Sequence, residues 1–130
     1  MSVLLDTSIV VDILRAYPSA LTFARTLEEP PTCSEVTRVE VLRGVRSGER
    51  SRTDRLLRSF RWAAVDEAVA RRAGELGRTY RRSHSGLGLA DLIIAATAEE
   101  HGLALETGNV KHYPMFEGLR PPYDASPTGR

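Results

Sequence analysis

The sequence has one cysteine, one lysine and no long apolar run, and these scarcities limit the kinds of protein that it can be. Cys33 alone cannot form an intrachain disulfide, which fits a reducing compartment. No apolar run approaches the roughly 20 residues that span a bilayer. The N-terminus reaches Asp6 after three apolar residues and lacks the basic region of a signal peptide. We therefore expect a cytoplasmic protein without membrane association.

The composition is that of an ordinary folded protein, with 42% hydrophobic and 27% charged residues. A length of 130 residues suits one domain and suffices to bury a core without disulfides. The sequence contains no internal repeat, heptad pattern or low-complexity segment. We predict a single domain over residues 1–124, and a disordered tail over 125–130 because that segment has nothing to pack against.

Arginine supplies nearly all of the basic charge, and the arginines are unevenly distributed. Residues 38–82 contain 13 arginines and 6 acidic residues, a net charge of +7, whereas the rest of the chain carries −6. Arginine forks bind phosphate and carboxylate groups bidentately, so this middle segment could contact nucleic acid or an acidic partner. The same distribution could equally reflect helix faces that are simply exposed to solvent.

Short apolar segments alternate with helical patterns along the chain. The expected strands are 3–5, 32–33, 62–65 and 103–105, and the expected helices are 8–14, 20–28, 35–45, 50–60, 66–82 and 89–101. Ser8, Ser34 and Asp66 are the predicted N-caps, and Gly102 is the predicted C-cap. This alternation predicts an α/β fold with a mostly parallel sheet.

Three acidic side chains stand against strongly apolar sequence, where an unpaired charge is unfavourable. Asp6 directly follows the first predicted strand, and Asp91 lies in the first turn of an apolar helix. Glu40 lies in a predicted helix on the same face as Val36 and Val39. Each acid alone has an ordinary explanation: a turn residue for Asp6, an N-cap for Asp91 and a salt bridge to a neighbouring arginine for Glu40.

The position of these acids favours a metal site over the separate explanations. Asp6 and the turn 107–109 both follow predicted strands, and sites in parallel sheets form at the carboxyl ends of strands. A divalent cation would neutralise a cluster of acids, and hard cations prefer oxygen ligands. The pattern therefore predicts an Mg²⁺ site, with Mn²⁺ as an alternative ion.

Four motifs occur in order between residues 3 and 123. They are Leu-Leu-Asp-Thr-Ser at 4–8, Thr-Arg-Val-Glu-Val-Leu-Arg-Gly at 37–44, Leu-Gly-Leu-Ala-Asp-Leu-Ile-Ile-Ala-Ala-Thr-Ala at 87–98, and Leu-Glu-Thr-Gly-Asn at 105–109. Together they resemble the motifs of PIN-domain proteins, in particular the VapC-type toxins of bacterial toxin–antitoxin pairs. The resemblance implies a three-layer α/β/α fold with a short, mostly parallel sheet.

The resemblance also implies a function and assigns roles to residues. The chain would be the toxin of a type II toxin–antitoxin system, a divalent-metal-dependent endoribonuclease that hydrolyses RNA. Asp6, Glu40 and Asp91 would hold the metal and form the catalytic centre. Supporting roles would fall to Thr7, Ser8, Thr107 and Asn109. A small VapB-type antitoxin would bind the acidic groove, and the toxin would form a homodimer.

The sequence departs from the family pattern at one position, where many relatives carry a fourth acid and this chain has His112. His112 could contact a substrate phosphate when protonated, ligate a softer ion, or lie at the surface. Lys111 beside it could contact phosphate or be solvated. The missing acid leaves a second interpretation open, a catalytically weak or inactive PIN-like module that binds RNA or protein. A phosphatase with Asp6 as nucleophile lacks the usual second aspartate two residues later.

Overall fold

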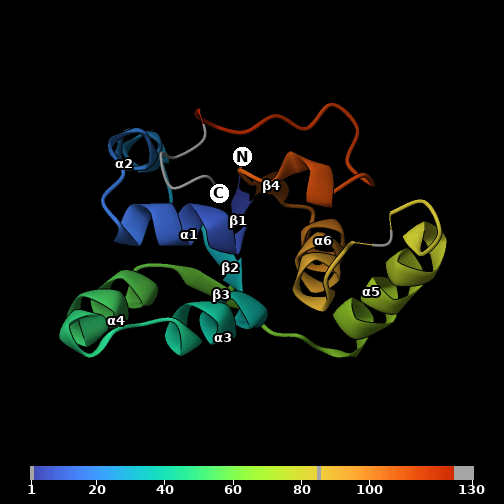
Figure 1. The fold of residues 1–130 in the computed structure, drawn as a ribbon, viewed down its shortest axis with the longest axis horizontal. Coiled ribbons are helices and arrows are strands. Elements are labelled where there is room, and N and C mark those ends of the chain that lie inside the picture. The colour runs from blue at the N-terminus through green and yellow to red at the C-terminus, as the bar shows by residue number, and fades with distance from the viewer. Residues whose placement is uncertain (1, 85, 125–130) are drawn as a thin grey trace.

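Four short strands form one sheet in the computed structural model, which describes residues 2–84 and 86–124 (Figure 1). The strands are β1 (Val3–Leu5), β2 (Thr32–Ser34), β3 (Arg61–Ala63) and β4 (Ala104–Glu106). They lie in the order β3-β2-β1-β4, and each is parallel to its neighbour. The predicted α/β class with a mostly parallel sheet is confirmed.

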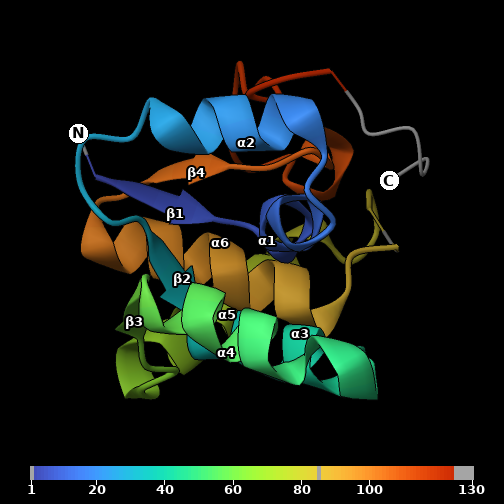
Figure 2. The same ribbon diagram turned by 90° about the vertical axis from the view of Figure 1, so that its left-hand side faces the viewer.

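Helices connect the strands throughout the described part of the chain. The α-helices are α1 (Thr7–Leu14), α2 (Pro18–Arg25), α3 (Glu35–Arg43), α4 (Arg50–Arg58), α5 (Glu67–Tyr80) and α6 (Leu89–His101), and the 3₁₀ helices are η1 (Ser47–Glu49) and η2 (Val110–His112). Figure 2 shows α2 and β4 above β1, with β2 and β3 below it. The order of the strands in the sheet can therefore be followed from top to bottom of the picture.

The sheet is covered on both faces, because successive side chains of a strand point in opposite directions. Leu4 packs in a buried cluster with Leu76 of α5 and Ile94 of α6. Leu5 packs in a second cluster with Ile9 of α1 and Leu57 of α4. Figure 1 shows α5 and α6 on one side of the strands and α1, α2 and α4 on the other. The three-layer α/β/α arrangement is therefore confirmed.

Several predicted helix ends are confirmed by their capping bonds. Ser34 Oγ accepts a hydrogen bond from Val36 N over 3.2 Å, and Asp66 Oδ1 accepts from Val69 N over 3.0 Å. Helix α6 has the predicted bounds and ends at Gly102, whose φ of +62° is in the left-handed region. That conformation costs glycine little because it lacks a Cβ atom.

Two helices begin earlier than predicted. Asp6, rather than Ser8, is the N-cap residue of α1, and Ser8 lies within the first turn. Helix α2 begins at Pro18 and ends at Arg25, whereas the prediction placed it over 20–28. A proline inside a helix breaks it, but a proline at the first helical position has no intrahelical donor to lose and a favourable φ.

The chain after η2 returns across the sheet toward α1 and α2. Tyr123 Oη donates to Asp12 Oδ2 over 2.9 Å, and its ring lies 6.0 Å from the ring of Phe23. The predicted tail over 125–130 lies outside the described residues. Among the helices of residues 2–84 and 86–124, none has the length and apolar character to cross a bilayer.

Candidate metal site at the carboxyl edge of the sheet

Asp6 is the most tightly held acid of the site. It follows β1 directly and is only 4% exposed. Its Oδ2 accepts hydrogen bonds from Ser8 Oγ over 2.8 Å and Thr107 Oγ1 over 2.7 Å. Its Oδ1 accepts from Tyr113 Oη over 2.9 Å. Three hydroxyl donors therefore hold both oxygens of this buried side chain in place.

The pairing of β1 with β4 brings Thr107 to Asp6. Leu5 is paired with Glu106, and Asp6 N donates to Glu106 O over 2.9 Å. The residues that follow the two strands therefore meet at the carboxyl edge, as the sequence predicted. Burial raises the pKa of the Glu106 carboxyl, which lies one residue before Thr107.

Asp91 reaches the same edge from the first turn of α6. Its Oδ2 accepts a hydrogen bond from Gly88 N over 3.2 Å, which satisfies a backbone donor at the start of the helix. A carboxylate in this position also faces the positive end of the helix dipole. His112 Nδ1 lies 3.3 Å from the same Oδ2, so the residue in place of the fourth acid lies beside the third acid.

Tyr113 joins the two aspartates. Its Oη donates to Asp6 Oδ1 and lies 3.5 Å from Asp91 Oδ1, while the residue itself is only 1% exposed. Burial, followed by the charges of Asp6 and Asp91, its hydrogen bond to Asp6, and the charge of Glu40, raises the pKa of Tyr113 far above its usual range. The phenol therefore remains protonated and acts as a donor between the two carboxylates.

Glu40 approaches this edge from α3. Thr7 Oγ1 donates to Glu40 Oε1 over 2.6 Å and lies 2.9 Å from Thr37 Oγ1. The expectation that Val39 shares the inward face of Glu40 is wrong, because Val39 is 61% exposed. The buried residue beside Glu40 on this helix is Thr37, three residues earlier, where helical geometry places it on the same face.

The turn after β4 is closed by side-chain bonds to its own backbone and to α1. Asn109 N donates to Thr107 Oγ1 over 2.9 Å, and Gly108 N donates to Ser8 Oγ over 3.2 Å. Asn109 thus contributes a backbone donor to this network, and Lys111 is exposed. The hydroxyls of Ser8 and Thr107 each link Asp6 to this turn, which fixes the carboxylate relative to β4.

We call Asp6, Glu40 and Asp91 the acidic edge. In the described part of the chain no group of three histidine, cysteine, aspartate or glutamate side chains is close enough to hold one ion directly. Asp6 and Asp91, however, both have an oxygen within 3.5 Å of Tyr113 Oη. Mg²⁺ keeps several waters and binds through one or two carboxylates, so an aspartate pair with Glu40 farther out fits such an ion.

The structure brings most of the sequence-predicted site residues into two hydrogen-bond networks and adds two residues. Asp6, Ser8 and Thr107 are directly linked, and Asp91 joins them through Tyr113. Glu40 belongs to the second network, with Thr7. Tyr113 and Thr37 are additions. The sequence offered one signal for Tyr113, because it directly follows His112, the position at which relatives carry the fourth acid.

The chain is similar to proteins of one family along nearly its whole length. The profile of the PIN domain matches residues 3–112. The ribonuclease VapC10 of Mycobacterium tuberculosis (strain ATCC 25618 / H37Rv) is 44% identical over 124 residues, which cover 93% of this chain and 92% of that protein. The ribonuclease VapC19 of the same strain is 42% identical over 123 residues, which cover 92% of this chain and 98% of that protein.

A solved structure agrees with these matches. A toxin-antitoxin complex from Klebsiella pneumoniae contains a chain with a TM-score of 0.83 and 30% identity, and the similarity covers 95% of this chain and 100% of that chain. The profile match and the identity to the two ribonucleases indicate the same family, and the acidic edge agrees with the site that the sequence motifs predicted. The chain belongs to the PIN-domain family, and within that family to the VapC type.

Proposed function

We propose that this chain is the toxin of a type II toxin–antitoxin system and acts as a divalent-metal-dependent endoribonuclease. The observation that supports the proposal most directly is the buried carboxylate of Asp6, held by three hydroxyls beside Asp91. These hydrogen bonds offset the cost of burying the side chain and fix both of its oxygens, as a metal ligand requires. The 44% identity to a protein named as a ribonuclease indicates RNA as the substrate.

PIN-domain ribonucleases generally depend on divalent metal ions. We propose Mg²⁺, with Mn²⁺ as an alternative, held by Asp6 and Asp91 with Glu40 farther out. Bound there, such an ion would polarise a phosphoryl oxygen and lower the pKa of an attacking water. The oxygen-only donor set of the three acids favours a hard cation over a softer one.

The hydrogen bonds suggest different roles for the acids. Both oxygens of Asp6 accept hydroxyl donors, so its position is fixed. Glu40 Oε1 accepts from Thr7, and no donor in the described residues is recorded within hydrogen-bond distance of Oε2. We propose that Glu40 Oε2 accepts the proton of the attacking water as the water oxygen bonds to phosphorus, while the P–O bond to the leaving nucleotide breaks and its oxygen takes a proton from solvent. Lys111 and His112 would contact the phosphate of the RNA.

RNA cleavage by the purified chain tests this function. The chain is freed of antitoxin and incubated with total RNA and Mg²⁺ or Mn²⁺. We expect wild type to cleave and Asp91→Asn to lose cleavage, because the substitution removes a carboxylate from the pair around Tyr113. Glu100→Gln is the matched control, because Glu100 is exposed near the other end of the same helix. Equal cleavage by wild type and Asp91→Asn would contradict the proposal.

The partner proposal is tested in cells. The similar Klebsiella pneumoniae structure is a toxin-antitoxin complex, and we propose that a VapB-type antitoxin inhibits this chain in the cytoplasm. Induced expression in a host without the antitoxin should arrest growth for wild type and not for Asp91→Asn. Co-expression of the antitoxin encoded beside the toxin should restore growth. Growth arrest by both proteins would show that toxicity does not depend on the carboxylate of Asp91, which would contradict the proposal.

We further propose that the chain forms a homodimer. Val39 and Leu42 of α3 are 61% and 42% exposed, and they lie three residues apart on one face of the helix. A second copy could cover these apolar side chains. Sedimentation should show a dimer for wild type and a monomer for Val39→Asp/Leu42→Asp, whereas Val65→Asp, at another exposed apolar residue, should remain a dimer.

A further inference from the structure

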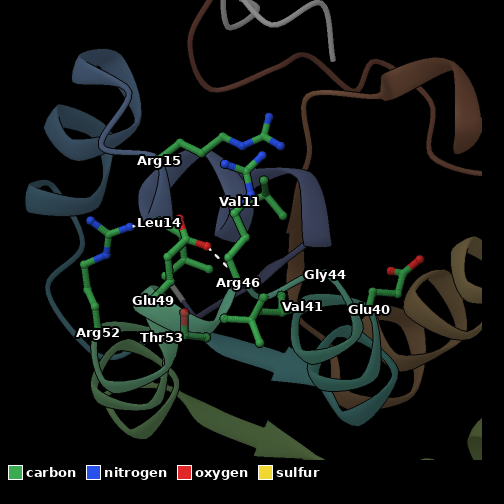
Figure 3. Close-up of a pocket in the computed structure, with 11 residues that line it drawn as sticks. Val11, Leu14, Arg15, Glu40, Val41, Gly44, Arg46, Glu49, Arg52 and Thr53 are labelled. Atoms are coloured by element: carbon green, nitrogen blue, oxygen red, sulfur yellow. Dashed lines mark hydrogen bonds and ion pairs between the residues drawn. The ribbon is translucent and has the colours of Figure 1, made fainter.

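A cavity of about 490 Å³ lies beside the acidic edge, between the end of α1, the end of α3 and the start of α4 (Figure 3). Its size falls within the range of small-ligand sites. Arg15, Arg46 and Arg52 line it, together with Glu40 and Glu49. We call it the arginine cavity. Two of its arginines belong to the basic segment 38–82, whose charge the acidic edge does not explain.

The charges in the arginine cavity are only partly balanced. Arg52 Nη2 lies 3.6 Å from Glu49 Oε2, which neutralises this pair. Arg15 and Arg46 have no acidic side chain within ion-pair distance among the described residues, and both are exposed. Figure 3 shows their side chains extending toward one another. Two neighbouring guanidinium groups repel each other, and an anion between them would remove that repulsion.

The arginine cavity and the acidic edge share Glu40. Figure 3 shows Glu40 and Arg52 at opposite ends of the lining. Thr7, at the start of α1, holds Glu40 at the acidic edge, while Arg15 lies just past the end of the same helix. An RNA strand that passes over Asp6 and Asp91 could therefore continue past Glu40 to Arg15 and Arg46.

We propose that the arginine cavity binds phosphates of the RNA strand next to the scissile bond, with Arg15 and Arg46 as the contacting side chains. The proposal rests on the ribonuclease function proposed above and identifies how the substrate is positioned. Arginine forks match the oxygens of a phosphate group and remain charged at every working pH. Phosphate contacts set the position of a nucleic acid without reading its sequence.

The lining indicates that the backbone of the RNA is bound, and not its bases. The apolar wall consists of aliphatic side chains: Val11, Leu14, Val41 and Val45. None of the described residues that line the cavity is aromatic, whereas single-stranded bases are usually bound by stacking on aromatic rings. The contact should therefore be independent of base identity.

The experiment measures RNA affinity in the full chain carrying Asp6→Asn, which prevents cleavage during the measurement. A mixed-sequence single-stranded RNA oligonucleotide is titrated between about 50 and 200 mM salt. Each lost phosphate contact should reduce the slope of log affinity against log salt by about 0.7, which corresponds to about fivefold weaker binding at about 0.1 M salt. Arg15→Ala/Arg46→Ala should therefore lose both contacts and bind about 25-fold more weakly.

Two further variants separate the contacts from general charge and from folding. Arg25→Ala/Arg71→Ala removes two exposed arginines elsewhere, at the end of α2 and in the first half of α5, and should change the slope little. Arg15→Lys/Arg46→Lys keeps both charges and should keep the slope while losing part of the affinity. Thermal unfolding should be unchanged in each, because Arg15 and Arg46 are exposed.

The outcomes distinguish this proposal from the function on which it rests. If wild type cleaves RNA but the Arg15→Ala/Arg46→Ala variant has the affinity and slope of the control variant, the arginines do not bind RNA. If that variant keeps RNA affinity but loses affinity for the antitoxin, the cavity serves an acidic protein segment, which also overturns the proposal. If wild type cleaves no RNA, the function fails, and the binding measurement still decides whether the cavity binds phosphate.

Discussion

The acidic edge and the arginine cavity share Glu40 but are built differently. At the acidic edge, Asp6 is buried, and each of its hydroxyl donors comes from another part of the chain or from the adjacent turn. In the arginine cavity, Arg15 and Arg46 are exposed and lie on long, flexible side chains. Fixed carboxylates suit a cation whose ligand geometry must be reproduced, whereas mobile arginines suit a flexible strand that can be met in several ways.

The largest effect should follow from Asp6→Asn, which breaks the acidic edge alone. We expect RNA cleavage to fall by more than the roughly 10- to 100-fold that loss of an outer-shell partner causes, because a proposed metal ligand is itself removed. RNA affinity should change little, since the arginines are intact. Cleavage rates and RNA titrations would be compared with Asp54→Asn, an exposed aspartate of α4. Parallel losses of affinity and cleavage would contradict the separation of the two regions.

Tyr113→Phe should have the second largest effect, because it removes only the hydroxyl between the aspartates. Metal affinity, measured by calorimetric titration with Mn²⁺, should fall roughly 10- to 100-fold. The matched control is Tyr80→Phe, which removes a hydroxyl from a half-buried tyrosine of α5. A metal affinity equal to that of wild type would show that the phenol does not orient the carboxylates.

The pH dependence of metal binding by Tyr113→Phe tests whether the phenol acts as a hydrogen-bond donor. Burial and the neighbouring carboxylates raise the pKa of Tyr113, so its proton is retained as the pH rises toward the usual tyrosine range. The ratio of wild-type to Tyr113→Phe metal affinity should therefore be constant from about pH 6 to pH 9. A ratio that falls toward one at alkaline pH would mean that the phenol ionises and ceases to donate.

A smaller effect is expected from Thr7→Val, at the residue that fixes Glu40. The variant removes the hydroxyl that donates to Glu40 Oε1 over 2.6 Å. Cleavage should fall by about tenfold, at the low end for an outer-shell change, because the half-buried Glu40 can recover a donor from water. Thr79→Val is the control, since Thr79 is an exposed residue of α5 whose Oγ1 donates to the backbone carbonyl of Glu75. If Thr7→Val lost as much cleavage as Asp6→Asn, Glu40 would have to be held as rigidly as the aspartates.

The smallest effect concerns Cys33 of β2, which packs in a buried cluster with Leu57 and with Val41, a residue that lines the arginine cavity. Burial raises the pKa of its thiol to about 12, so almost no thiolate is present at pH 8. Alkylation should be negligible in the folded chain, with or without RNA, and rapid in denaturant. Labelling that increases when RNA binds would show that α3 and α4 move apart, and that the cavity is remodelled by its ligand.

The fold could be predicted from the sequence because its elements carry local signals. The first strand is a short apolar run that ends at Asp6, and helix α6 is an apolar run that ends at a glycine. The wrong bounds occurred where a local rule has two meanings, as at Pro18, which begins a helix although proline also breaks helices.

Only those contacts of the site that follow from the order of the strands could be predicted. Asp6 and Thr107 were expected together because parallel strands end at one edge, and this pair is present. The bond from the Tyr113 hydroxyl to Asp6 could not be predicted, because it requires η2 to return over Asp6. The arginine cavity was beyond prediction, because it depends on how α1, α3 and α4 pack.

The bond between Thr107 and Asp6 joins residues 101 positions apart, and the bond from Tyr113 joins residues 107 positions apart. During synthesis, Asp6 therefore emerges from the ribosome together with Ser8 but long before the other two hydroxyls that bind it. The hydrogen bonds around Asp6 cannot be complete until β4 and η2 have been made and have docked. In the proposed nuclease, the nascent chain would therefore stay inactive until nearly all of it has been synthesised, and an antitoxin could bind during that delay.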